Sequence, residues 1–122
     1  MSKPETMMID EVKYVRADAV TKKAESMNGM KYCIIRTYSA GVFAGYVESR
    51  EGKEAVIRNS RGLWYWDGAY GLSQLAVDGT SKPDNCKFTV SVDKRELVEV
   101  IEVIECTQKA KESIEGVKLW KK

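Results

Sequence analysis

The chain has 122 residues and a formal net charge of +2, with 43% hydrophobic and 31% charged residues. These values are typical of one globular domain and exclude a disordered chain, a general DNA-binding protein and, since no apolar run reaches about 20 residues, a membrane-spanning helix. The sequence contains no histidine, which excludes catalytic and metal sites that need an imidazole. We therefore expect no enzyme activity, no metal site, no cofactor, no membrane partner and no general nucleic-acid binding.

Residues 1–30 are predicted to form an N-terminal arm, because they contain too few large apolar residues for a core of their own. Two short strands are expected around Asp10 and Glu11, followed by a helix over Ala17–Met27 that Asn28 and Gly29 end. Such an arm often packs on a neighbouring subunit, and we take this as a hypothesis.

Residues 31–122 are predicted to form a single α+β domain. Runs rich in β-branched and aromatic residues predict an antiparallel meander of strands at residues 32–38, 42–48, 54–59 and 63–66, with turns at 39–41, 51–53 and 60–62. A short helix at 69–77, β-rich segments at 87–92 and 97–105, and a helix at 108–115 with Thr107 as N-cap follow. The helices are expected to pack on one face of the sheet.

Trp64, Tyr65 and Trp66 are the most unusual local feature of the sequence. On a strand the two indoles point to one face and the phenol to the other. They either seal the sheet against a helix or form a stacking wall for a planar ligand, where each base contact contributes roughly 1–3 kcal/mol. Both interpretations stay open at this point.

Three arginines accompany these aromatic residues: Arg36 on the first predicted strand, Arg58 on the third, and Arg61 in the turn before the tryptophans. Guanidinium groups bind phosphate in a bidentate manner, so the set predicts a pocket for a phosphorylated nucleotide. The predicted ligand-binding set also includes Tyr38, Phe43 and Asn59. The alternative is that the arginines lie on the surface and pair with Glu48, Glu51 or Glu54.

Two further segments are candidate parts of this site. The small residues of Ser39–Gly45 would let a ligand approach the backbone closely, although a turn and a strand kink explain Gly41 and Gly45 equally well. Lys109 and Lys111 either lie on a solvated surface or reach a phosphate held by another subunit. The cysteines, Cys33, Cys86 and Cys106, lack metal-binding spacing and are expected to be buried thiols.

The strings YCIIRTYSAGVFAG at 32–45, SREGKEAVIRNSRGLWYWDGA, LSQLA, SKPDNCKF and ELVEVIEVIECTQKAKESIEGVKLW resemble a small protein of tailed phages and prophages, known as a domain of unknown function. The resemblance covers residues 31–122 and implies a phage-derived protein of the host bacterial cytoplasm.

The order of meander, helices, arginines and aromatic wall is also similar to the anti-Thoeris family of phage immune-evasion sponges. That resemblance implies a homodimer or hexamer that sequesters cyclic ADP-ribose isomers or cyclic oligonucleotides. It implies that Arg36 stacks on adenine or contacts phosphate, that Arg58 and Arg61 bind phosphate, and that Lys109 or Lys111 closes the pocket.

The sequence therefore predicts a sponge that binds a host nucleotide second messenger without cleaving it. The alternative from a different class is a phage protein that docks on a host enzyme through its sheet edge or aromatic face and inhibits it. A phosphodiesterase or lyase acting on such a signal is the least favoured hypothesis, because histidine and a metal cluster are missing from the sequence.

Overall fold

The computed structural model describes residues 23–120. The predicted strands around Asp10 and the first part of the predicted helix lie outside the described residues. Over residues 23–27 the predicted helix is wrong, because the chain is extended there: Lys23 forms an isolated bridge with Thr107, and the amide of Ala24 donates to the Cys106 carbonyl at 3.0 Å. Backbone pairing with the body of the domain has replaced local helix formation in this segment.

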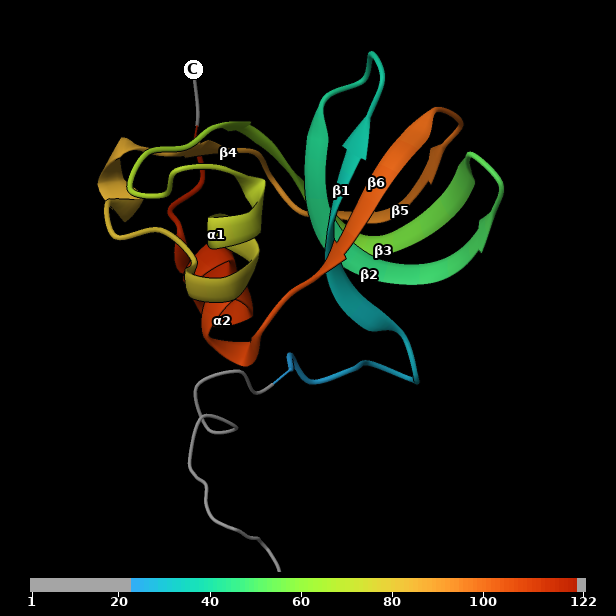
Figure 1. Cartoon of the computed structure of the whole chain (residues 1–122), viewed down its shortest axis with the longest axis horizontal. Helices are drawn as coiled ribbons and strands as arrows, with labels where there is room; N and C mark the ends of the chain where they lie inside the picture. Colours follow the sequence, from blue (N-terminus) through green and yellow to red (C-terminus); the bar gives the residue numbers. More distant parts are fainter. Residues whose placement is uncertain (1–22, 121–122) are drawn as a thin grey trace, which may run out of the picture.

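Between residues 23 and 120 the chain forms an α+β fold. The strands are β1 (Lys31–Thr37), β2 (Val42–Glu51), β3 (Glu54–Tyr65), β4 (Lys87–Phe88), β5 (Val92–Leu97) and β6 (Val100–Glu105). The helices are α1 (Leu72–Asp78), the short 3-10 turn η3 (Pro83–Asn85) and α2 (Gln108–Gly116). Figure 1 shows α1 and α2 side by side on one side of the curved antiparallel sheet, as predicted. No helix within these residues is both long and apolar enough to cross a membrane.

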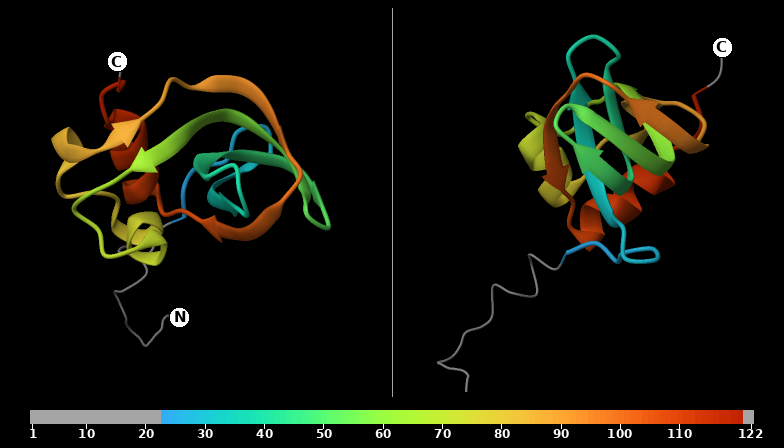
Figure 2. Two further views of the ribbon diagram at one scale, coloured as in Figure 1. Left: turned by 90° about the horizontal axis from the view of Figure 1, so that it is seen from above. Right: turned by 90° about the vertical axis from the view of Figure 1, so that its right-hand side faces the viewer.

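The sheet curls because β5 and β6, which follow each other in the chain, pair with two different strands of the sheet. Its order is β4-β3-β2-β1-β6, and β5 pairs with the edge of β3 that faces away from β2. Only Val98 and Glu99 separate β5 from β6, yet β5 pairs with β3 and β6 pairs with β1. The predicted single strand at 97–105 is therefore wrong. The break at these two residues lets one chain segment close the sheet into the barrel-like curve visible in Figure 2.

The curvature divides the apolar residues into two cores. The smaller one fills the inside of the curl and contains Cys33, Ile35, Phe43, Ala55, Ile57, Leu97 and Val100. The larger one lies between the sheet and the helices and includes Tyr32, Ile34, Leu63, Leu75, Phe88, Ala110 and Ile114. Because neighbouring residues of β1 alternate between the two cores, this strand is buried on both faces over most of its length.

The third and fourth predicted strands form one continuous strand, β3, so the predicted turn at residues 60–62 is wrong. Ser60 is fully buried and Arg61 is only 8% exposed. Asn59 has a left-handed backbone (φ +49°), and at this point β3 changes its partner from β5 to the short β4. A polar Ser-Arg-Gly sequence, typical of a turn, is accommodated in a buried strand because both polar side chains find internal partners.

The guanidinium of Arg61 supplies the largest set of those internal contacts. Its Nε donates to the carbonyl of Thr89 at 2.9 Å, and Nη2 donates to that of Phe88 at 3.2 Å. Its Nη1 donates to the carbonyls of Ile114 and Val117 at 3.0 and 2.8 Å. These last two carbonyls lie at the C-terminus of α2, where backbone oxygens lack helical partners and a positive charge is favoured. One side chain thus joins β3, the end of β4 and the end of α2.

The N-cap and the buried face of α2 agree with the prediction, whereas the start of α1 does not. The Thr107 side chain accepts from the Ala110 amide at 3.1 Å, which confirms the predicted N-cap of α2. Ala110 and Ile114 are buried as predicted. Helix α1 begins at Leu72 rather than at residue 69, because its N-cap Gly71 has an extended backbone (φ 178°, ψ −173°) that interrupts helical geometry before Leu72.

The described cysteines are free and buried, as predicted. Burial raises the pKa of Cys33 to about 11 and that of Cys106 to about 12. Since the thiolate is the reactive form, both groups are unreactive core residues at neutral pH.

Gly45 lies at an irregularity in the pairing of β2 with β3, where an added Cβ would come within 2.7 Å of the Ser60 Cβ. We expect Gly45→Ala to reduce the free energy of unfolding by about 1–3 kcal/mol, because the buried backbones must move apart. Gly116→Ala is the matched control, since an added Cβ there meets no atom within 4 Å. Urea unfolding measures both variants, and equal stabilities would contradict the packing constraint.

Arg61→Lys keeps the positive charge but removes the planar fork that reaches four carbonyls. We expect a loss of about 3 kcal/mol in the free energy of unfolding, because buried carbonyls are left without donors. The same substitution at the exposed Arg36 should change stability by less than about 1 kcal/mol. Denaturant unfolding of both variants tests the difference, and a similar effect at the two positions would show that Arg61 does not hold the fold together.

Candidate functional site

The predicted arginine pocket does not form, because the three arginines are used separately. The Nε of Arg36 donates to Glu102 on the neighbouring strand β6 at 3.0 Å. Arg58 pairs with Glu48 at 2.6 Å and with Asp93 at 3.4 Å. The prediction that these residues converge with Arg61 is therefore wrong. Cross-strand carboxylates neutralise the first two, and backbone carbonyls occupy most donors of the third.

Three further residues of the predicted site, Tyr38, Lys109 and Lys111, also lie apart from one another. Lys109 lies near Asp78 at 3.7 Å on the surface. Lys111 is mostly covered: its ammonium pairs with Glu115 at 3.0 Å and lies 5.8 Å from the centre of the Tyr32 ring. Tyr38 is 79% exposed and stands on the turn after β1. None of these three predicted residues lines the cavity that gathers the aromatic members of the predicted set.

That cavity, which we call the aromatic cavity, has a volume of about 310 Å³. It brings together three predicted residues: Phe43 from β2, Trp64 from the end of β3, and Trp66, which follows that strand. Its other lining residues are Ala40, Gly41, Val42, Gly62, Leu63, Thr89 and Arg95. The volume lies near the lower end of the range for small-molecule sites. The lining contains no carboxylate or thiol, so the cavity offers stacking surfaces and one positive charge.

Arg95 supplies that charge, and the sequence did not single it out. Its guanidinium carbon lies 4.4 Å from the centre of the Phe43 ring, and its Nε donates to Ser60 at 3.0 Å. Within residues 23–120 no carboxylate lies at ion-pair distance from it, which distinguishes it from Arg36 and Arg58. Burial lowers the pKa of this guanidinium, but arginine remains charged at neutral pH.

The sequence position of Arg95 explains why it was missed. It stands between Lys94 and Glu96, in a run that is typical of a solvated strand face. The useful signal is the pairing of β5 with β3, which places Arg95 opposite Ile57 and next to the inner core. No local pattern reveals that pairing.

Two glycines, Gly41 and Gly62, line the aromatic cavity. Gly41 has a φ of +108°, a conformation that favours glycine in the turn between β1 and β2. At Gly62 an added Cβ would lie 3.1 Å from the Thr89 Oγ1, on the wall of the cavity. The Gly41 turn and the Gly45 irregularity confirm that the glycines of this segment serve the turn and the strand kink.

The two tryptophans have different surroundings, and only Trp66 packs against the core as the first interpretation predicts. Trp66 is half-buried and packs against the core between sheet and helices. Trp64 is 67% exposed and stacks on Trp120, with ring centres 5.0 Å apart and planes inclined by 6°. The ammonium of Lys87 lies 5.3 Å from the Trp64 ring and 5.6 Å from the Trp120 ring. We call Trp64, Tyr65, Lys87 and Trp120 the exposed aromatic cluster.

A second hollow lies on the other side of Thr89, and we call it the polar hollow. Its volume is about 450 Å³, and it contains the predicted residues Asn59 and Arg61. The other lining residues are Tyr32, Thr89, Val90, Ser91, Glu115, Val117 and Leu119. The predicted residues that line a cavity are therefore divided into an aromatic group and a polar group, and the two cavities share Thr89 as a wall residue.

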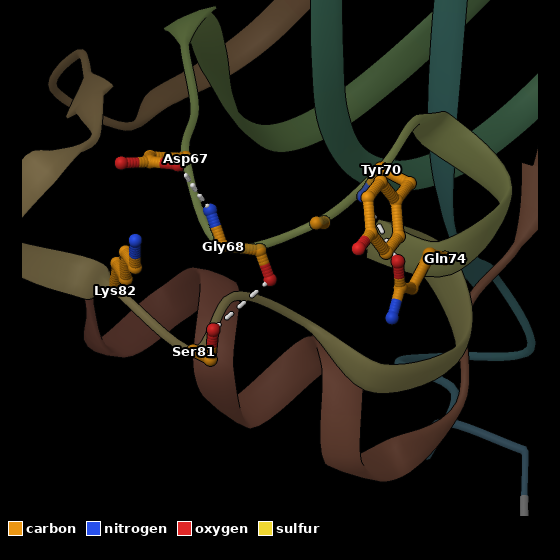
Figure 3. Close-up of a pocket in the computed structure, with 7 residues that line it drawn as sticks. Asp67, Gly68, Tyr70, Gln74, Ser81 and Lys82 are labelled. Carbon is orange, nitrogen blue, oxygen red and sulfur yellow. Dashed lines mark hydrogen bonds between the residues drawn. The ribbon is translucent and has the colours of Figure 1, made fainter.

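A third hollow of about 390 Å³ lies in the loop before α1. Figure 3 shows Tyr70 and Gln74 on one side of it and Asp67 and Lys82 on the other. Asp67 accepts from the Asn85 amide at 3.1 Å and from the Gly68 amide at 2.8 Å, and these bonds hold its pKa below the usual range. Its carboxylate is thus used to shape the loop.

Comparisons with known proteins identify a family. No curated protein and no solved structure matched the chain. The family described as a domain of unknown function (DUF6948) matches residues 30–114, which span β1 to most of α2. The match covers both sides of the aromatic cavity. The chain belongs to this family.

Proposed function

We propose that the protein binds a small nucleotide in the aromatic cavity and holds it without cleaving it. The base would stack on the exposed indole side of the cavity, and a phosphate would bind the guanidinium of Arg95. The observation that carries this proposal is an arginine in an aromatic cavity with no carboxylate partner among residues 23–120.

The environment of Arg95 favours an anion. The guanidinium is half-buried, and its Nε is fixed by Ser60, so that the terminal nitrogens keep their donors for another acceptor. The nearby ring of Phe43 attracts a cation but satisfies none of its hydrogen bonds. A phosphate at this position would accept charge-assisted bonds in partly desolvated surroundings, where such bonds are stronger than in water.

The aromatic walls favour a planar group beside that anion. Trp64 exposes two thirds of its surface, which is unusual for an indole in a small domain. Stacking of one base on such a side chain contributes roughly 1–3 kcal/mol. The lining offers no carboxylate or thiol that could act as general base or nucleophile. This combination supports capture of the ligand rather than a chemical step.

The resemblance to phage sponges narrows the ligand to a nucleotide second messenger. We propose a cyclic ADP-ribose isomer or a cyclic oligonucleotide as the ligand, the host bacterial cytoplasm as the place of action, and a homodimer or hexamer as the assembly. The described cavity is open on one side, and a second subunit over that side would bury more of the ligand.

Calorimetry with cyclic ADP-ribose isomers and cyclic di- and trinucleotides tests the proposal. We expect binding to the full chain, a loss of at least tenfold in affinity for Arg95→Gln, and a loss of roughly 5- to 150-fold for Trp64→Ala. Arg36→Gln is the matched control, since Arg36 pairs with Glu102 away from the cavity. Mass spectrometry of the ligand released by heating should recover it unchanged. Absence of heat with every compound would overturn the proposal, and altered products would indicate an enzyme.

The exposed aromatic cluster favours a second candidate function. A stacked, exposed pair of indoles around Lys87 is the kind of anchor that protein interfaces use, and it agrees with a protein that docks on a host enzyme.

Trp120→Ala separates this candidate from nucleotide capture. Trp120 does not line the aromatic cavity. If nucleotide capture is the function, the variant should therefore retain its nucleotide affinity within about threefold. If the protein docks on a host enzyme, the variant should lose that enzyme, because interface anchors contribute about 2 kcal/mol or more. The host enzyme is first recovered by its binding to tagged wild-type protein. Size-exclusion chromatography of that enzyme with the wild type and with the Trp120→Ala variant then measures docking. Co-elution of the Trp120→Ala variant with that enzyme would contradict docking through the cluster.

A further inference from the structure

The polar hollow contains a buried hydroxyl group without a hydrogen-bond partner. Tyr32 is 2% exposed, and within residues 23–120 no group donates to its hydroxyl or accepts from it by normal hydrogen-bond geometry. Its ring packs edge-on against Tyr46 at 5.2 Å between ring centres. A buried polar group left unpaired costs about as much as a lost hydrogen bond, so native structures rarely retain one without water or a ligand.

The hydroxyl end of Tyr32 faces the charged residues of the hollow. Both Glu115 and Arg61 act on its ionisation, the carboxylate raising the pKa and the guanidinium lowering it, while burial has the largest effect and raises it. The phenol is therefore neutral and able to donate a hydrogen bond at every physiological pH. Tyr32, Glu115 and Arg61 line the same hollow.

The charges around the hollow do not cancel. Glu115 forms an ion pair with Lys111 at 3.0 Å, and these two groups neutralise each other. Arg61 is buried and bonded to four backbone carbonyls, but no carboxylate of residues 23–120 lies at ion-pair distance from it. A buried cation without a counterion is unfavourable. The polar hollow therefore has a net positive charge.

Arg61 also retains one donor. A guanidinium has five N–H groups, and four of them are used by the carbonyls that Arg61 bonds, which leaves one N–H on Nη2. The wall beside these groups is apolar and consists of Val90, Val117 and Leu119. The lining of the hollow thus combines two hydrogen-bond donors, a positive charge and an apolar surface.

We propose that the polar hollow is a second ligand site, which binds a small organic molecule through an oxyanion group, either phosphate or carboxylate. The oxyanion accepts from the Tyr32 hydroxyl and the free N–H of Arg61, and the apolar body of the ligand lies against Val90, Val117 and Leu119. This site is separate from the aromatic cavity and does not depend on nucleotide binding there.

Titration of the 15N-labelled full chain with inorganic phosphate, against sodium chloride at equal ionic strength, tests the site. We expect saturable chemical-shift changes at Arg61 Nε and at the amides of Thr89 and Ser91. Sodium acetate is the carboxylate probe, and n-butyl phosphate should bind more tightly than inorganic phosphate because its chain covers the apolar wall. Tyr32→Phe removes only the hydroxyl and should weaken phosphate binding at least tenfold.

Two controls make the outcome decisive. Tyr32→Phe should unfold at the same or a higher urea concentration than the wild type, because an unpaired hydroxyl is removed. Arg95→Gln should leave phosphate binding in the polar hollow unchanged, which distinguishes this site from the aromatic cavity. Absence of saturable shifts with all three probes, equal phosphate affinity of Tyr32→Phe, or a clear loss of its stability would each overturn the proposal.

Discussion

The fold depends on the way in which a single buried guanidinium satisfies backbone carbonyls from three segments. Arg61 lies in β3 and bonds to the carbonyls of Phe88 and Thr89 on one side and of Ile114 and Val117 on the other. The short β4 also pairs with β3, and Phe88 and Ile114 pack in the larger core, so the guanidinium acts together with backbone pairing and apolar burial. By tying these segments together, this side chain helps to form the two walls between which the polar hollow lies, and it sets Thr89 as the boundary of the aromatic cavity.

Four of the five arginines of the sheet illustrate how tertiary surroundings assign different tasks to one residue type. Arg36 and Arg58 point to the outer surface and meet carboxylates on neighbouring strands, so their charge is neutralised within the chain. Arg61 is buried and structural. Arg95 is half-buried, lies over Phe43 and has no acid beside it among the described residues. An anionic planar ligand would pair with a cation that lacks a carboxylate and lies next to aromatic rings. The proposed nucleotide capture therefore rests on Arg95 rather than on the other three arginines.

The curl of the sheet brings these groups together. Because β5 and β6 pair with opposite edges, residues of β5 reach the inner face of the curl beside residues of β2 and β3. The C-terminal residues then return along β4, where Leu119 forms a parallel bridge with Phe88 and Trp120 stacks on Trp64. The aromatic cavity, the polar hollow and the exposed aromatic cluster therefore lie around one short stretch of chain, residues 87–90, although their members come from all parts of the sequence.

The sequence by itself determined the class of the fold, the first two strands, the cap and inner face of α2, the burial of the thiols and the aromatic part of the candidate site, because these depend on local spacing, β-propensity and capping chemistry. Only the tertiary structure decided that residues 60–62 continue a strand, that the segment at 97–105 breaks to close the sheet, and which arginine stands unpaired. Those outcomes depend on partners more than 20 residues away, such as Arg61 with Val117 or Arg95 with Ser60. A local pattern contains no information about such partners, so Arg61 resembled a turn residue and Arg95 a solvated one.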